Sequence, residues 1–92
     1  MSENVKIIKV SGGSPVKETA GSMLKCHMEG KYDSIELRAV GAAAVNQMYK
    51  ALAVAGGLFA QKGKIFLVKP GFSEIDIDGE KKTALIARLN IR

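Results

Sequence analysis

The sequence predicts an α+β fold, a two-layer βαβαββ sandwich in which a mixed four-stranded sheet is backed by two helices. The chain has 92 residues, enough for one compact domain over residues 1–92, and 47% of them are hydrophobic. Short β-branched segments alternate with helical patterns in the first two thirds. Alternating segments around an Asp-Gly pair then predict a hairpin.

The first strand is expected at VKIIKV, residues 5–10, before the breaker cluster SGGSP. Ser14 and Pro15 suit the N-cap and first position of a helix, because serine accepts an orphan amide hydrogen and proline lacks one. Gly30 suits the end of that helix. The expected apolar face consists of Val16, Ala20, Met23, Leu24 and His27.

Residues 34–39 alternate in a period of two, which predicts a strand with Ile35, Leu37 and Ala39 facing inward. Strand, helix and strand over about thirty residues form a βαβ unit. We therefore expect a right-handed crossover and two parallel strands.

The long helical pattern after Gly41 is apolar on two faces. Lys50 is its only charged residue as far as Phe59. An exposed apolar stripe of this length marks an association site, so another helix or a second subunit should cover the second face. The expected dimer interface consists of Val45, Met48, Tyr49, Leu52, Ala53, Phe66 and Val68.

Residues 65–68 are apolar on both faces, which predicts a strand that is central or covered by a neighbouring subunit. Asp78-Gly79 predicts the turn of an antiparallel hairpin. From Ala84, the last strand places Leu85, Ala87, Leu89 and Ile91 on one side.

The segment VGAAAVNQMYKALAVAGGLFA resembles the signature helix of the stage V sporulation protein S family. The opening KVSGGSPV, the connector KPGFSEIDIDGEKKTA and the last strand extend the resemblance over nearly the whole chain. The family is similar in element order to the Alba chromatin proteins, which implies an Alba-like fold. Two departures remove positive charge: GAAAV replaces the arginine-containing helix start of Alba, and Gly56 stands where the sporulation family usually has arginine.

Fourteen Lys and Arg against nine Asp and Glu give a formal charge of +5, which is compatible with nucleic acid. The turn at residues 11–14 is interpreted first as a sharp turn and second as a phosphate site. For Asn46 and Gln47, hydrogen bonds across a dimer interface or to a strand end are favoured over nucleic-acid contact. The candidate nucleic-acid-binding residues are Lys9, Ser11, Gly12, Gly13, Ser14, Lys17, Arg38, Asn46, Gln47, Lys81 and Lys82.

A single cysteine beside a single histidine, Cys26 and His27, supports neither a disulfide framework nor a zinc site nor a catalytic set. The N-terminal MSENVKII has no export signal pattern, and no apolar run is long enough for a membrane span. The acidic series in DIDGE is too short for a calcium loop. We expect a cytoplasmic non-enzyme without metal or cofactor.

Three functions are compatible with these patterns. The first, implied by the resemblance, is a dimeric nucleic-acid-binding regulator of sporulation or related development that binds DNA or RNA mainly through backbone charge. The second is a protein-interaction module in cell division or spore assembly. The third is a site for a small anionic ligand, such as a nucleotide, at the turn.

Overall fold

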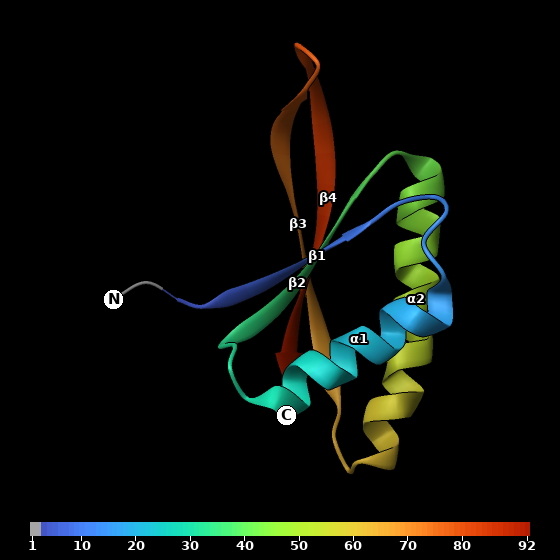
Figure 1. The fold of residues 1–92 in the computed structure, drawn as a ribbon, viewed down its shortest axis with the longest axis vertical. Coiled ribbons are helices and arrows are strands. Elements are labelled where there is room, and N and C mark those ends of the chain that lie inside the picture. Colours follow the sequence, from blue (N-terminus) through green and yellow to red (C-terminus); the bar gives the residue numbers. More distant parts are fainter. Residues whose placement is uncertain (1–2) are drawn as a thin grey trace.

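A computed structural model describes residues 3–92. The chain forms β1 (Val5–Val10), α1 (Val16–Glu29), β2 (Ser34–Val40), α2 (Ala42–Gln61), β3 (Phe66–Ile77) and β4 (Glu80–Ile91). The strands make one four-stranded sheet in the order β1-β2-β4-β3. Both helices pack on the same side of this sheet, and the far end of the β3–β4 hairpin extends beyond them (Figure 1). The predicted α+β fold and element order are confirmed.

The core lies between the sheet and the helices. Ile35, Leu37 and Ala39 of β2 are buried at alternate positions, as their spacing predicts. They pack in one cluster with residues of both helices, including Met23 of α1 and Phe59 of α2. β1 is parallel to β2, and β4 is antiparallel to both β2 and β3, so the sheet is mixed.

The first helix starts one residue later than predicted, because Ser14 was the expected N-cap. Pro15, with an extended ψ of 126°, is the N-cap, and no side chain caps the helix. The Ser14 hydroxyl instead accepts a hydrogen bond from the amide of Ser11 at 2.9 Å. Gly30 ends the helix at φ 71°, as expected for a left-handed terminator.

β3 is longer than the predicted segment 65–68 and lies at the sheet edge, so the central position is wrong, while cover by a neighbouring subunit stays a prediction. It continues through Lys69 and Pro70. In a central strand, backbone N–H groups donate to the neighbouring strands on both sides. Proline has no backbone N–H, so within a sheet it is largely confined to edge strands and bulges. Asp78 and Gly79, at φ 51° and 80°, form the predicted hairpin turn.

Alternation divides the sheet into two faces that differ in cover. Residues in register with Leu37 face the helices, including Ile8 and Ala87. Neighbouring positions such as Glu36 and Arg38 point to the opposite side. No helix of residues 3–92 packs there, and we call that side the helix-free face.

Candidate nucleic-acid interface

The turn between β1 and α1 is closed by its own serines. The Ser14 amide donates to the Ser11 carbonyl at 3.1 Å, and the two hydroxyl oxygens lie 3.2 Å apart. The Gln47 side-chain amide of α2 donates to the Ser14 carbonyl at 2.9 Å. The turn is therefore a fixed structure held by α2.

The same turn approaches the start of α2 closely. A Cβ at Gly12 would lie 3.1 Å from the Cβ of Ala43, so only glycine allows this distance without a shift. Gly41, at φ 91°, begins α2, and no side chain caps this helix either. The first turn of α2 contains no acidic residue. Uncapped amides and the positive ends of two helix dipoles thus lie around the turn, an arrangement that favours an anion.

Two cationic side chains lie beside the turn. Lys9 and Arg38 are register partners on β1 and β2. Together with Ser11 and Gly12 they line a hollow of about 550 Å³, to which β3 adds the apolar Ile75 and Ile77 and the acidic Asp76. The Arg38 Nε donates to Glu36 at 2.7 Å. Four sequence-predicted candidates therefore lie together in the structure.

The remaining candidates are distributed more widely. Gln47 bonds within the chain to the turn, so the expected bond across an interface or to a strand end is not the one observed. Lys17 is exposed in the first turn of α1, and Gly13 has open space around its Cα. Asn46 lines a different hollow with Val45 and Tyr49. Lys81 and Lys82 lie on the hairpin, where Lys82 pairs with Glu80 at 3.5 Å.

The expected dimer-interface residues gather on the helix side of the sheet. Six of them line one hollow of about 430 Å³ between α2 and the β3–β4 hairpin, which we call the apolar groove: Met48, Tyr49, Leu52, Ala53, Phe66 and Val68. Val45 lines the adjoining hollow with Tyr49. Tyr49 and Phe72 protrude beside the groove at 73% and 74% exposure. The second apolar face of α2 thus has no cover within residues 3–92, and the groove lies beside it.

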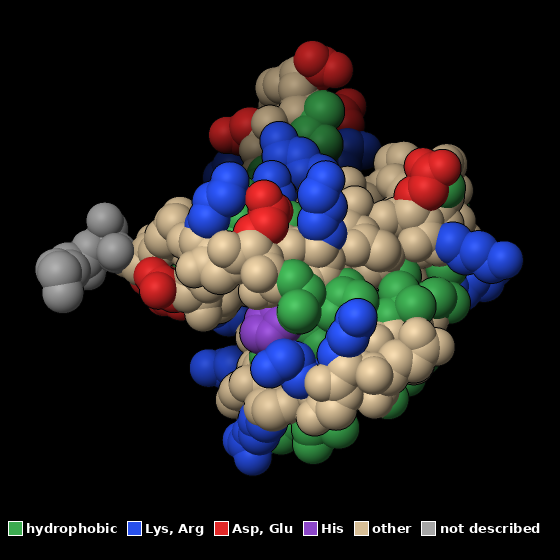
Figure 2. Space-filling model, turned by 60° about the horizontal axis from the view of Figure 1, so that its bottom comes forward, with side chains coloured by type: hydrophobic (Ala, Val, Ile, Leu, Met, Phe, Trp, Pro, Cys, Tyr) green, Lys and Arg blue, Asp and Glu red, His purple; other side chains and the backbone are tan. Residues whose placement is uncertain are grey.

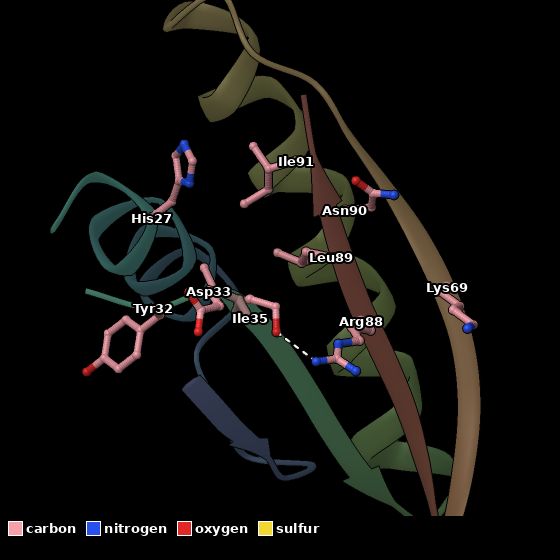
Figure 3. Close-up of a pocket in the computed structure, with 10 residues that line it drawn as sticks. His27, Tyr32, Asp33, Ile35, Lys69, Arg88, Leu89, Asn90 and Ile91 are labelled. Carbon is pink, nitrogen blue, oxygen red and sulfur yellow. Dashed lines mark hydrogen bonds between the residues drawn. The ribbon is translucent and has the colours of Figure 1, made fainter. Parts of the chain in front are cut away.

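Lys69 and Arg88 were not among the candidate nucleic-acid-binding residues. Alternation along the last strand nevertheless places Arg88 on the side opposite the apolar residues of that strand. Lys69 and Arg88 are register partners on β3 and β4 and line a hollow of about 410 Å³ (Figure 3). Arg88 donates to the Ser34 hydroxyl at 2.9 Å and pairs with Glu3 at 2.5 Å. The predicted turn at Asp78-Gly79 already implies this register, but the pair was outside the candidates because the strand was expected only at residues 65–68.

His27 lines the same hollow from α1 and packs against Phe59, with ring centroids 5.6 Å apart. Burial, and to a lesser degree the positive charge of Lys64, lower the pKa of His27 below its ordinary value. At neutral pH the ring is therefore uncharged and adds no cation to this surface.

The overall charge is scattered on the face seen in Figure 2, where acidic side chains lie between several Lys and Arg. Hydrophobic side chains form a band there beside the single histidine. Within residues 3–92, no three His, Cys, Asp or Glu side chains are grouped as metal ligands. No helix of this part of the chain is long and apolar enough to span a membrane.

Comparison with known proteins agrees with the architecture. The model of the family described as Stage V sporulation protein S matches residues 6–92. Among solved structures, the chain is similar to Alba from Thermoplasma volcanium, with a TM-score of 0.60 and 11% sequence identity. The match covers 91% of this chain and 98% of that one. At this identity the similarity demonstrates the fold.

Proposed function

The chain belongs to the Stage V sporulation protein S family and has an Alba-like fold, and from this premise we propose that it is a small dimeric nucleic-acid-binding regulator. It would act in the cytoplasm during sporulation or related development, without catalysing a reaction. Binding would be dominated by the charge of the nucleic-acid backbone. The supporting observation is the hollow where Lys9 and Arg38 meet the turn before α1.

The chemistry of that hollow suits a phosphate group. Lysine and arginine supply positive charge, and nearby helix starts supply unpaired amides. The Ser11 and Ser14 carbonyls and the Ser14 hydroxyl accept hydrogen bonds within the chain. These bonds keep the turn in one conformation, so little ordering is needed on binding. None of these groups is arranged to read a base edge, which favours backbone contacts over sequence recognition.

Dimerisation is the second part of the proposal. The apolar groove has protruding aromatic side chains, Tyr49 and Phe72, close to a concave surface on the same side of the molecule. A surface that carries both a projection and a hollow can pair with its own copy around a two-fold axis. Such a pairing would cover the second face of α2 and bring two copies of the turn into one assembly.

The test of nucleic-acid binding is fluorescence anisotropy with duplex DNA and single-stranded RNA in a salt series. Charge reversal of Lys9 and Lys17 together should weaken binding to all sequences similarly and flatten the salt dependence. Reversal of Lys25 and Lys50, exposed lysines on the helices, is the matched control. Unchanged affinity of the Lys9 and Lys17 variant would contradict the placement of the site at the turn.

The hairpin favours a second candidate function, a non-enzymatic interaction module in cell division or spore assembly. Its tip carries Glu74, Asp76, Asp78 and Glu80 alongside Lys81 and Lys82, so it is no uniformly basic arm. Acidic side chains repel phosphate but suit a basic protein surface. Absence of salt-dependent binding to any nucleic acid would favour this candidate over the first.

A further inference from the structure

Each of the four strands carries at least one basic side chain on the helix-free face, and β4 also carries Lys82, which pairs with Glu80. Lys9 of β1 is in register with Arg38 of β2, and Arg88 of β4 is in register with both Glu36 of β2 and Lys69 of β3. All four cations alternate with residues that face the helices, so they point to the same side. We call Lys9, Arg38, Arg88 and Lys69 the basic band.

The band is only partly neutralised. Glu36, which is 9% exposed, forms an ion pair with Arg38 at 2.7 Å, and Glu3 forms one with Arg88 at 2.5 Å. Within residues 3–92, Lys9 and Lys69 have no carboxylate within ion-pair distance. Like charges directly opposite each other on neighbouring strands destabilise a sheet, and Lys69 lies directly opposite Arg88. An anion between them would remove that repulsion.

The band is also flanked by concave surface at both ends. Lys9 and Arg38 line the hollow of about 550 Å³ beside the turn. Lys69 and Arg88 line the one of about 410 Å³, where Asn90 and Ser34 add polar groups (Figure 3). Asp33 and Tyr32 line it as well, and the Asp33 carboxylate accepts a hydrogen bond from the Asn4 amide. The cations therefore border hollows that can admit phosphate oxygens.

We propose that the basic band binds the sugar–phosphate backbone of duplex nucleic acid, so that the contact surface extends from the turn across the helix-free face. This inference rests on the proposed function and names the class of nucleic acid. Three strand spacings of about 4.8 Å separate β1 from β3, or roughly 14 Å. One strand of a duplex presents a phosphate about every 3.4 Å along the axis, so on the order of four phosphates lie within that distance.

Within residues 3–92, no strand places an aromatic side chain on the helix-free face. Proteins that bind single-stranded nucleic acid stack bases on aromatic side chains. The aromatic residues of the strands, Phe66 and Phe72, are in register with Ile91 and Leu85, on the helix side. Tyr32, before β2, lines the hollow with Lys69 and Arg88, and its ring faces the Lys6 ammonium, 5.7 Å from the ring centroid. On the helix-free face the cations have aliphatic neighbours such as Ile7 and Ile86. Such a surface would contact the sugar–phosphate backbone and leave the bases paired.

The test compares Lys69→Gln, Lys69→Gln with Arg88→Gln, and a control with Lys25→Gln and Lys50→Gln. Binding to a 20-base-pair duplex and to its single strand is measured by anisotropy between low and physiological salt. The slope of log K against log salt should become less negative by about 0.9 per chain for the single variant and by about 1.8 for the double variant. The control should match the wild type, and the duplex should bind more tightly than the single strand.

Lys69→Gln alone keeps the experiment interpretable if loss of the Arg88 bonds to Ser34 and Glu3 impairs folding, because Lys69 is exposed and forms no ion pair with residues 3–92. Wild-type affinity and slope in both variants, with reduced binding after reversal of Lys9 and Lys17, would overturn the inference and leave the proposed function standing. A preference for the single strand would also overturn it. No salt-dependent binding by the wild type would overturn both.

Discussion

The two faces of the β3–β4 hairpin differ in both chemistry and cover. On the helix side, Phe66 and Val68 border the apolar groove beside α2. On the helix-free face, Lys69 and Arg88 are paired across the same two strands. Because side chains alternate along a strand, one hairpin can present an assembly surface and a charged surface at once. The comparison teaches that the proposed assembly and the proposed backbone binding can be tested separately, by substituting residues on one side of the hairpin or on the other.

The largest expected effect separates the two surfaces by blocking assembly. Ala53→Glu puts a carboxylate without a partner into the apolar groove. Burying it at an interface should cost about 3–5 kcal/mol, which is more than a hundredfold in the dimer dissociation constant. Sedimentation velocity at micromolar concentration should show a wild-type dimer and a monomeric variant.

Two results would show that the apolar groove is not the interface. One is a monomeric wild type, and the other is normal assembly of the Ala53→Glu variant. Gln61→Glu, an exposed position at the end of α2, adds the same charge outside the groove and serves as the control.

A smaller effect is expected at the link between α2 and the turn. Gln47→Ala leaves the Ser14 carbonyl without its side-chain donor, which should lower the free energy of unfolding by about 1 kcal/mol and the Tm by roughly 4–8 °C. Nucleic-acid affinity should also fall, because the turn is less ordered, while sedimentation is unchanged. Asn46→Ala, at an exposed neighbour, is the control for the melting measurement. Equal melting of the two variants would contradict a role for Gln47 in holding the turn.

The smallest effect concerns His27, which lines the hollow with Lys69 and Arg88 but adds no cation there at neutral pH. Its pKa in the folded chain lies below the ordinary 6.5, so the unfolded chain binds a proton more readily. The free energy of unfolding should therefore decrease as pH falls through 6.5 and level off below the folded-state pKa. Urea unfolding between pH 7.5 and 5 should show this decrease in the wild type and a reduced one in His27→Gln. A rise in stability toward low pH would contradict the assignment.

Local patterns predicted most of the architecture because they report on single elements. Alternation placed Ile35 and Leu37 in the core, and Gly30 and Asp78-Gly79 gave correct chain reversals. The apolar run at residues 65–68 predicts a central or covered strand, whereas β3 lies at the sheet edge, the position that Pro70 within the strand indicates.

The site was less predictable than the fold. The turn with Lys9 and Arg38 followed from its place between a strand and a helix. Lys69 and Arg88 each lie nine positions from the predicted Asp78-Gly79 turn, so the hairpin register pairs them, but a strand expected only at residues 65–68 did not include Lys69. The Gln47 bond to Ser14 depends on how α2 packs against the turn. Contacts between distant segments are set by tertiary packing, which no local period encodes.

The central claim is that the protein binds nucleic acid as a dimer and mainly through backbone charge. Its most direct test is the salt dependence of duplex binding, compared between the wild type and Ala53→Glu. With roughly three to five phosphates neutralised per subunit, the monomeric variant should give a slope of log K against log salt of about −3 to −5. The wild type, binding with two subunits, should give a slope about twice as steep. Equal slopes would contradict binding by the dimer, and slopes near zero would contradict nucleic-acid binding through backbone charge.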